Sequence, residues 1–307
     1  MGKLVVLRPG ALGDAVVTLP VLAALGAASP GAQRMVVGHP LFGLAAEAGL
    51  VEEWAGSDDT RLVPLFGGDG ACPLVAGAEL CISYGGSDGG VLAASLARSG
   101  VRRVVRWPAR PPAGVHVVDH LLAALEPAGI EAVTRTPRLA PQAPWLASAD
   151  ALLAGRGMGE GFVAMHPGSG GRAKRWPAER FAEVARRLAR PVVWLLGPAE
   201  GEADAEKLKA IGERVGTVVE SPDLTTLAGI LARCRLYVGN DSGVSHLAAA
   251  IGAPAVAVFG ATDPRCWAPR GGRVAAVGSP ERGGLDGVTP DDVLAAARRV
   301  REVRTAP

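Results

Sequence analysis

Short apolar runs alternate with longer stretches in which alanine and leucine recur at helical spacing, almost from one end of the chain to the other. Runs rich in Val, Leu and Ile predict buried strands, and an apolar residue every three or four positions predicts a helix. We predict strands over 4–7, 35–37, 80–83, 101–107, 162–165, 192–196, 217–219, 236–238 and 255–258, and helices over 14–25, 41–48, 91–98, 115–125, 178–188, 200–214, 224–232, 242–251 and 290–304. This alternation is typical of α/β proteins with parallel sheets.

The pattern stops once, over residues 130–144, which contain three prolines and no sustained period. We place a linker there, which predicts two Rossmann-like domains, 1–145 and 146–307. The final predicted helix, 290–304, ends in arginines. These positive charges suit the negative end of the helix dipole, and they also suit packing back against the first domain.

Composition excludes several classes of protein. The 307 residues are 49% apolar and carry a net charge of only +2, so the chain should fold and is not expected to bind nucleic acid. Four scattered cysteines without a C-x-x-C spacing indicate neither a zinc site nor a disulfide framework. The apolar run at the N-terminus is too short for a signal peptide or a membrane span. A cytoplasmic location is expected.

A polar loop, Arg8-Pro9-Gly10-Ala11-Leu12-Gly13-Asp14, follows the first predicted strand. Ligands of open parallel sheets bind beyond the carboxyl ends of the strands, so this loop is expected to face a binding crevice. Only Gly10 and Gly13 fit the glycine fingerprint of dinucleotide sites, which makes such a site poorly supported. Asp14 either caps the next helix, as its position alone favours, or serves as a general base.

A second loop, His166 to Pro177, is rich in glycine and also links a strand to a helix. It lacks the Gly at 173 and the Ser or Thr at 175 that a P-loop would need, which disfavours a Mg²⁺-dependent nucleotide hydrolase. Its small residues still let backbone N–H groups approach an anion, and Lys174 supplies positive charge for a diphosphate. The alternative is a flexible loop with a solvated lysine. The small residues are Gly168, Ser169, Gly170 and Gly171.

A third segment, Tyr237 to Ala250, combines a strand, a polar turn and a helix whose first amides can bind an anion. Asp241 would repel a phosphate, so we expect it to cap the helix or to bind a sugar hydroxyl. His246 is either a buried structural histidine, which spacing favours, or a donor to phosphate. A further polar loop from Phe259 to Pro264 follows the next strand.

Together and in this order, these segments resemble glycosyltransferase family 9, the ADP-heptose:lipopolysaccharide heptosyltransferases. The resemblance rests on Arg8, Leu12, Gly13, Asp14, Thr18, Leu19 and Pro20; on Pro167, Gly168, Lys174, Trp176 and Pro177; and on Asp241–Ala250, Gly252, Pro254 and Phe259–Pro264. It implies a GT-B fold of two facing Rossmann-like domains with a cleft between them. The C-terminal domain would hold an ADP-sugar donor and the N-terminal domain a lipopolysaccharide core acceptor.

The resemblance also implies roles for individual residues. Asp14 would be the catalytic base, taking a proton from an acceptor hydroxyl as it attacks the anomeric carbon with inversion. Lys174 would stabilise the departing diphosphate. The implied donor-binding residues are His166, Gly168, Ser169, Lys174, Glu200, Asp241, Ser242, Gly243 and His246. No D-x-D motif occurs, so we expect no metal ion or cofactor, with any further positive charge coming from the helix end and from Arg172 or Arg175.

Arginines in the first half are candidates for the acceptor site. Arg98, Arg102, Arg103, Arg106 and Arg110 lie in an acid-free segment, and guanidinium groups suit the phosphates and carboxylates of an inner core. The alternative is a solvated edge strand protected by charge. We predict Arg8, Gly13, Arg102, Arg103 and Arg106 as acceptor contacts.

Three further readings stay open at this point: transfer from another sugar nucleotide, sugar-nucleotide 2-epimerisation, and sugar-nucleotide binding without catalysis. A lipopolysaccharide acceptor would also place the protein in peripheral contact with the inner face of the cytoplasmic membrane.

Overall fold

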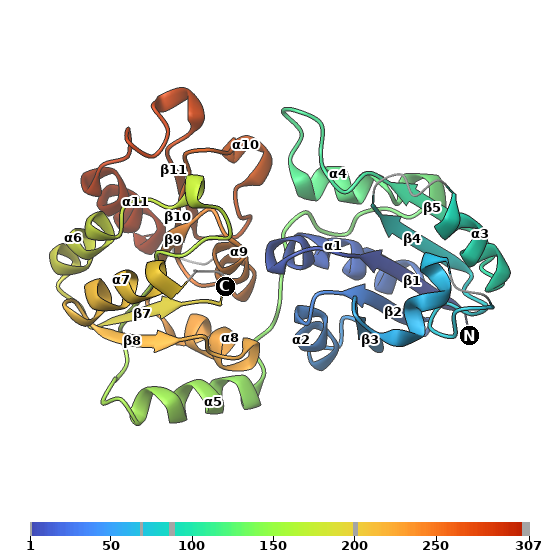
Figure 1. Cartoon of the computed structure of the whole chain (residues 1–307), viewed down its shortest axis with the longest axis horizontal. Coiled ribbons are helices and arrows are strands. Elements are labelled where there is room, and N and C mark those ends of the chain that lie inside the picture. The colour runs from blue at the N-terminus through green and yellow to red at the C-terminus, as the bar shows by residue number, and fades with distance from the viewer. Residues whose placement is uncertain (1, 68–69, 86–89, 199–201, 303–307) are drawn as a thin grey trace. The chain divides into compact units, whose positions relative to one another are not determined.

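The computed structural model describes residues 2–67, 70–85, 90–198 and 202–302, which divide into two compact units (Figure 1). Unit 1 is Met1–Pro137 and unit 2 is Arg138–Pro307, so the boundary falls inside the stretch 130–144. It lies before residue 145, where we predicted the first domain to end. Each unit is an α/β fold with one parallel sheet.

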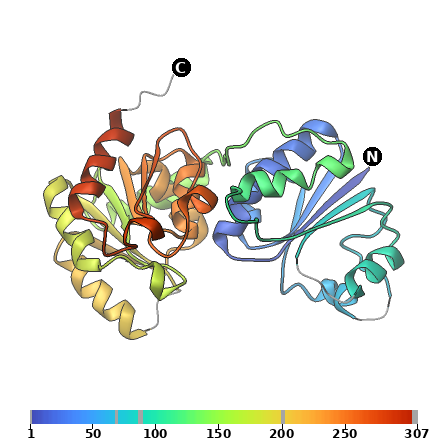
Figure 2. The ribbon, with the colours of Figure 1, turned by 90° about the horizontal axis from the view of Figure 1, so that it is seen from above.

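Unit 1 contains a five-stranded sheet in the order β3-β2-β1-β4-β5, with every pair of strands parallel. The central strands are almost wholly buried because helices cover both faces of the sheet, as Figure 2 shows. Its elements are β1 (Lys3–Arg8), α1 (Leu12–Ala28), β2 (Gln33–Gly38), α2 (Leu41–Glu47), β3 (Glu53–Gly56), the 3₁₀ helix η1 (Thr60–Phe66), β4 (Leu80–Tyr84), α3 (Val91–Arg98), β5 (Val104–Trp107), α4 (Val117–Ala123) and the 3₁₀ turn η2 (Glu126–Ala128).

Unit 2 contains a six-stranded parallel sheet in the order β11-β10-β9-β6-β7-β8. Trp176, Phe181 and Trp194 pack edge to face in its core. The elements are α5 (Ala143–Ala154), β6 (Val163–His166), the 3₁₀ turn η3 (Arg172–Lys174), α6 (Ala178–Leu188), β7 (Val192–Leu196), α7 (Glu202–Glu213), β8 (Thr217–Glu220), α8 (Leu224–Arg233), β9 (Leu236–Asn240), α9 (Gly243–Ile251), β10 (Ala255–Val258), α10 (Pro264–Trp267), β11 (Val274–Val277), the 3₁₀ turn η4 (Pro280–Arg282) and α11 (Pro290–Glu302).

Each sheet has one topological switch point, where successive crossovers leave toward opposite faces. In unit 1 it lies between β1 and β4, because α1 packs with α2 and α4 whereas α3 packs with η1. In unit 2 it lies between β6 and β9, because α6 packs with α7 and α11 whereas α9 packs with α8. The loops diverge at these points and leave room beyond the carboxyl ends of the strands for a ligand.

The linker prediction missed helix α5, which begins at Ala143. Pro144 lies in its first turn, where proline is tolerated because that residue's N–H has no helical partner. The helix packs closely on α8: a Cβ added to Gly229 would lie 2.0 Å from the carbonyl oxygen of Trp145. The short edge strands β3 and β11 were also missed.

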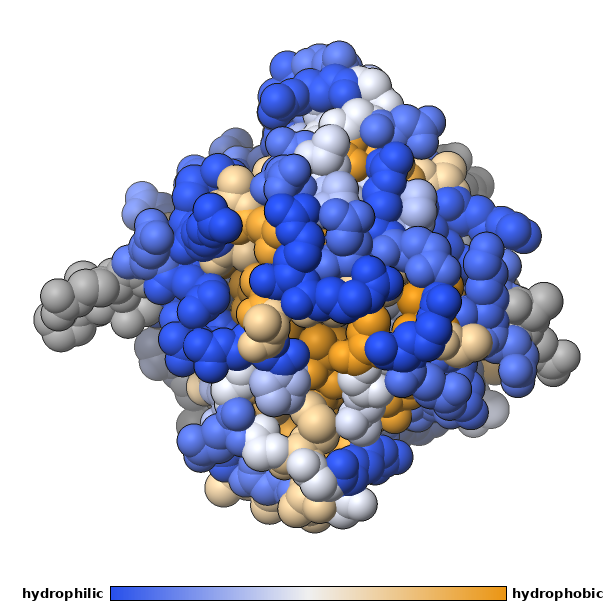
Figure 3. Space-filling view, turned by 90° about the vertical axis from the view of Figure 1, so that its left-hand side faces the viewer, coloured by the Kyte–Doolittle hydropathy of each residue, from blue (hydrophilic) through white to orange (hydrophobic). Residues whose placement is uncertain are grey.

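Helix α11 buries Val293, Leu294, Ala297 and Val300 in the core of unit 2, where it packs against α6, β10 and β11. Its apolar face is therefore occupied within unit 2, and packing against the first domain is not needed to bury it. Figure 3 views the molecule from the side on which α6 and α7 lie in Figure 1, and on this face hydrophilic residues surround a smaller apolar area near the middle.

Candidate active site

Asp14 lies in the first turn of α1, beyond the carboxyl end of β1. The helix begins at Leu12 with Ala11 as its N-cap, so Asp14 is its third residue and not its N-cap. Its Oδ2 accepts a hydrogen bond from the Ala11 N–H at 3.0 Å, and its Oδ1 accepts one from the Arg8 guanidinium at 2.7 Å. Two donors thus fix the orientation of a carboxylate that is still 36% exposed. The structure therefore gives Asp14 a capping contact and leaves it accessible to a substrate.

Gly10 makes this arrangement possible, a role that the sequence reading did not assign. Its φ is +144°, and a Cβ at this position would lie 2.6 Å from Oδ2 of Asp14. Any other side chain would collide with the carboxylate. Gly13, a predicted acceptor contact, is the second residue of α1 and precedes Asp14 in the chain.

Arg8 orients Asp14 from the interior of unit 1. Its side chain is only 1% exposed, its Nε donates to Oγ1 of Thr18 at 3.3 Å, and its guanidinium lies 5.8 Å from the centre of the Tyr84 ring. Burial lowers the pKa of Arg8, and the charge of Asp14 opposes that shift. Arg8 is buried and donates to Thr18 and Asp14, and its contact with the acceptor stays a prediction.

His39, at the end of β2, was not singled out from the sequence. Its Nδ1 accepts a hydrogen bond from the Leu41 N–H at 3.1 Å. Burial lowers the pKa of His39, and the nearby charge of Asp14 opposes that shift. The ring is therefore neutral at pH 7, with its proton on Nε2.

The predicted acceptor arginines do not gather at the Asp14 edge. Arg102 and Arg103 precede β5, and the Arg102 N–H donates to the carbonyl of Ala78, which precedes β4. In a parallel sheet this is the amino edge, opposite the carboxyl edge that holds Asp14. Arg106 is paired in register with Ser83, near the carboxyl end of β4, and is exposed. Of these three arginines, only Arg106 lies toward the carboxyl edge.

The switch point of unit 2 is held together by Asn240, the last residue of β9. Its side chain is fully buried, its Nδ2 donates to the carbonyl of Pro167 at 2.7 Å, and its Oδ1 accepts from the Trp176 N–H at 3.0 Å. One amide therefore fixes both ends of the loop after β6. The sequence reading missed Asn240, although a polar residue ending an apolar strand was a signal for it.

Lys174 and Asp241 form an ion pair across this switch point. The Nζ of Lys174 lies 2.7 Å from Oδ2 of Asp241, and the Thr262 hydroxyl donates to the same oxygen at 2.5 Å. The Asp241 side chain is 7% exposed and that of Lys174 is 36% exposed, so the ammonium group is the more accessible partner. Asp241 is not the N-cap of α9. That position is Ser242, whose side chain makes no capping hydrogen bond.

Helix α9 presents the start of its dipole at the same place. Gly243 is its first residue and Ser242 makes no side-chain cap, so the first amides keep hydrogen-bonding capacity for a ligand. The turn is rigid, because the Ser245 hydroxyl donates to the Asn240 carbonyl at 2.5 Å and contacts the Tyr237 hydroxyl at 3.0 Å. His246 is the fourth residue of the helix and is 7% exposed.

The other polar groups of the β6 loop have partners within unit 2. Gly168 and Ser169 are buried, and the Ser169 hydroxyl donates to the carbonyl of Asp241 at 3.0 Å, which ties the two loops together. Arg175 donates to the carbonyl of Ser169 and pairs with Asp204 at 2.8 Å. Arg172 lies 3.6 Å from the same carboxylate. The positive charge of these two arginines is thus partly neutralised by Asp204, as that of Lys174 is by Asp241.

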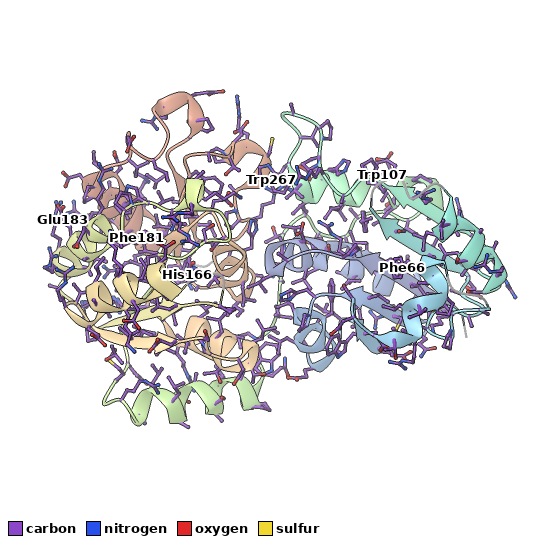
Figure 4. The ribbon with its side chains drawn as sticks, in the orientation of Figure 1. Phe66, Trp107, His166, Phe181, Glu183 and Trp267 are labelled. Carbon is purple, nitrogen blue, oxygen red and sulfur yellow. The ribbon has the colours of Figure 1, made fainter. Side chains whose placement is uncertain are left out.

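His166, labelled in Figure 4, ends strand β6 beside these loops. Its Nδ1 is buried without a hydrogen-bond partner. Burial, with a smaller contribution from the positive charge of Arg175, lowers the pKa of His166 to about 4. The ring is neutral at pH 7, so His166 can act toward an anion only as a hydrogen-bonding group.

Three further predictions concern Glu200, metal ions and membrane-spanning helices. Glu200, a predicted donor contact, lies outside the described residues. Within the described ranges, no group of three or more His, Cys, Asp or Glu side chains is arranged to hold a metal ion. No helix among the described residues is both long and apolar enough to cross a membrane.

Two sheets of Rossmann type, each with polar loops at its switch point, define an α/β protein of the GT-B class. Solved structures match this fold over nearly the whole chain. A glycosyltransferase of family 9 from Veillonella parvula matches with a TM-score of 0.80 and 21% identity, covering 98% of this chain and 97% of that one. The ADP-heptose heptosyltransferase II of Escherichia coli matches with a TM-score of 0.75 and 20% identity, covering 97% and 98%. A UDP-GlcNAc 2-epimerase from Methanocaldococcus jannaschii also matches, with a TM-score of 0.55 and 10% identity over 98% of this chain and 93% of that one.

Comparison of the sequence with family models shows which family the chain belongs to. The family model of glycosyltransferase family 9 (heptosyltransferase) matches residues 90–290, and the chain belongs to that family. Lipopolysaccharide heptosyltransferase 3 of E. coli is 30% identical over 172 residues, 52% of this chain and 48% of that protein. Lipopolysaccharide heptosyltransferase 2 of Salmonella typhimurium is 36% identical over 101 residues, 31% of this chain and 29% of that protein. The chain thus spans about half or less of the length of these curated relatives.

Proposed function

We propose that the chain transfers heptose from ADP-heptose to a hydroxyl group of a lipopolysaccharide inner core, with inversion at the anomeric carbon. Family membership supports the reaction class. The solved E. coli heptosyltransferase WaaC with ADP, and the same protein with ADP-2-deoxy-2-fluoro heptose, support the choice of nucleotide. The observation that carries the proposal is the accessible ammonium of Lys174 beside the uncapped start of α9.

The donor's diphosphate is assigned to unit 2. An ammonium group has three N–H donors, so Lys174 can keep Asp241 on one and offer the others to phosphate oxygens. The amides of Ser242 and Gly243 add donors along the helix dipole. Asp241 would repel the diphosphate, so we assign its free oxygen to a hydroxyl of the donor sugar. His246 and Ser169 border this site as further contacts.

Asp14 in unit 1 is assigned as the general base. It takes the proton of an acceptor hydroxyl as that oxygen forms a bond to the anomeric carbon of the heptose. The bond from this carbon to the diphosphate breaks, and its electron pair leaves with ADP. The charge that develops on the departing phosphate is stabilised by Lys174 and the α9 amides. The two donors on Asp14 contribute by fixing where its oxygens lie before the acceptor binds.

This scheme requires no metal ion, because the chain's own groups face the developing charge. A lipid-anchored acceptor also implies work at the inner face of the cytoplasmic membrane, in peripheral contact with it. If transfer needs no metal ion, activity should persist in excess EDTA.

The direct test mixes the full chain with ADP-heptose and a deacylated inner-core acceptor, and follows both ADP release and the mass of the acceptor. We expect ADP release that depends on the acceptor, together with an acceptor heavier by one heptose. Altered sugar configuration without a heavier acceptor would favour the 2-epimerase alternative. Donor binding without any product would favour a sugar-nucleotide binding protein.

A further inference from the structure

A pocket of about 550 Å³ opens at the amino edge of the sheet in unit 2, where β9, β10 and β11 begin. Arg235 directly precedes β9, Pro254 precedes β10 and Arg273 precedes β11, and all three line the pocket. Asp241 follows the opposite end of β9. At about 3.3 Å per residue, the length of this strand separates Arg235 from Asp241 by about 20 Å. The pocket is therefore distinct from the proposed diphosphate site.

The last turns of α11 supply the other wall of this pocket. Arg298 and Arg301 line it, are exposed, and lie on the same face of the helix because they are one helical turn apart. The buried face of α11, with Val293 and Val300, packs against β10 and β11. This packing holds the two arginines beside the strand starts that carry the others.

The pocket gathers positive charge in a chain whose net charge is only +2. Four of its seven lining residues are arginines, and one is a glutamate. Within the part of the chain that the structure describes, Arg235, Arg298 and Arg301 form no ion pair and no side-chain hydrogen bond. Arg273 donates to the carbonyl of Gly252 at 2.9 Å, and the other N–H groups of its guanidinium stay available. The pocket thus offers many unused donors.

The negative ends of helix dipoles account for part of this charge. Gly252 is the C-cap of α9, and Arg301 lies in the last turn of α11. Helix ends do not require that arginines from two strand starts and one helix line the same pocket. Like charges that face one pocket repel one another, and a bound anion turns that repulsion into attraction.

The lining indicates which anion fits. A guanidinium group presents its N–H donors as a fork that matches the oxygens of phosphate in pairs. Four such groups exceed what a single phosphate can use. None of the described residues that line the pocket is aromatic, so it offers no surface on which a nucleotide base could stack. Neighbouring phosphate groups on a ligand without an aromatic ring are the best match.

We propose that this pocket binds a ligand that carries at least two neighbouring phosphate groups. Soluble polyphosphates and the headgroup of cardiolipin both have this chemistry. The assignment is independent of the proposed function, because its residues lie at the edge of the sheet opposite the donor site.

The first test is calorimetric titration of the full chain at low salt with tripolyphosphate and with inorganic phosphate. Tripolyphosphate should bind at least about tenfold more tightly than inorganic phosphate, since it engages several guanidinium groups at once. In Lys174→Ala its affinity should change less than about twofold, because Lys174 lies at the other edge of the sheet. That variant separates the pocket from the diphosphate site.

A matched pair of variants on α11 locates the binding. Arg298→Gln should weaken tripolyphosphate binding by about three- to tenfold. Arg299→Gln makes the same change at the next residue, which is exposed but does not line the pocket, and should change the affinity less than about twofold. Arg235→Gln, at the start of β9, should match the loss seen in Arg298→Gln if both elements form one site. Thermal melts check that each variant folds.

A vesicle arm distinguishes the two sources of phosphate. Sedimentation with vesicles of phosphatidylcholine alone is compared with sedimentation with phosphatidylcholine that contains cardiolipin. Binding to the cardiolipin vesicles that Arg298→Gln weakens and Arg299→Gln does not would identify the lipid headgroup. Tripolyphosphate binding without vesicle binding would identify a soluble ligand. Either result supports the pocket as a polyphosphate site.

Three results would overturn the assignment: equal affinities for tripolyphosphate and inorganic phosphate, equal effects of Arg298→Gln and Arg299→Gln, or loss of binding in Lys174→Ala. A lower melting temperature in Arg298→Gln with unchanged binding would also overturn it, since the arginine would then serve only the helix end. Failure of the glycosyl-transfer proposal would appear in the product assay and would leave these titrations unchanged.

Discussion

The two switch points have the same topology and opposite chemistry. In unit 2, the loops after β6 and β9 bring together an ammonium, a carboxylate, two serine hydroxyls and the start of a helix. In unit 1, the loop after β1 presents one oriented carboxylate, and a pocket at the carboxyl ends of β1 and β4 is mainly apolar. The backbone arrangement thus fixes where a ligand binds, and the loop residues decide which ligand it is.

The difference also lies in how the charged groups are held. Unit 1 buries its cation, Arg8, and leaves the carboxylate of Asp14 the more exposed partner, whereas unit 2 buries the carboxylate of Asp241 and leaves Lys174 the more exposed. An exposed carboxylate suits proton removal, and an exposed ammonium suits an anionic ligand. The predictions for Gly10 and Lys174 below each remove one side of this contrast.

Apart from replacement of Asp14 itself, the largest expected effect comes from Gly10→Ala. A methyl group 2.6 Å from Oδ2 of Asp14 would displace the carboxylate, so turnover should fall by about a hundredfold while ADP affinity stays unchanged. Steady-state kinetics and calorimetric ADP titration measure the two quantities. Gly49→Ala is the matched control, because Gly49 also has a positive φ but nothing within 4 Å of its would-be Cβ. A similar loss of turnover in both variants would assign the effect to backbone strain alone.

A smaller effect is expected on the free energy of unfolding when the pH is lowered. Because the folded pKa of His166 is about 4 and the unfolded value about 6.5, the unfolded state takes up the extra proton as the pH falls through that window. The free energy of unfolding should fall by about 2 kcal/mol between roughly pH 7 and pH 4.5 from this group. Urea unfolding of wild type and His166→Asn compares the two slopes. An equal loss in the variant would exclude His166 as its source.

The smallest of these effects concerns the ammonium of unit 2. Lys174→Ala should weaken ADP binding by about tenfold, since one charged hydrogen-bond donor to the diphosphate is lost. Arg172→Ala is the control from the same loop, because Arg172 is 84% exposed and faces Asp204. Its ADP affinity should change less than about twofold. If the two variants bound ADP equally well, Lys174 would have no part in the diphosphate site.

The sequence predicted the elements that determine the fold, because parallel strands buried on both faces leave nearly continuous apolar runs, as in β7. It also placed Asp14, Lys174 and Asp241 on loops that follow strands, since the strand-to-helix order alone sets the edge at which such loops lie. The sequence did not predict β3, because its residues Glu53–Gly56 form no apolar run. It did not predict α5 either, because Pro144 suggested a linker where the helix begins.

The partners of the charged groups could not be predicted. Whether Arg8 contacts a substrate or a neighbouring carboxylate depends on burial and side-chain direction, which the spacing of residues does not fix. The pairing of Lys174 with Asp241 joins residues that lie far apart in the chain. The apolar pocket likewise draws on β1, η1, β4 and α3, which no local pattern connects.

The central claim is that unit 1 supplies the base and unit 2 holds the nucleotide. Asp14→Asn tests it most directly, when turnover with ADP-heptose and the affinity for ADP are measured on the same preparation. The account predicts a loss of turnover of about 10² to 10⁴ with ADP affinity unchanged, and little effect of the control Asp119→Asn, whose carboxylate pairs with Arg135. Turnover within about tenfold of wild type, or a parallel loss of ADP affinity, would contradict it.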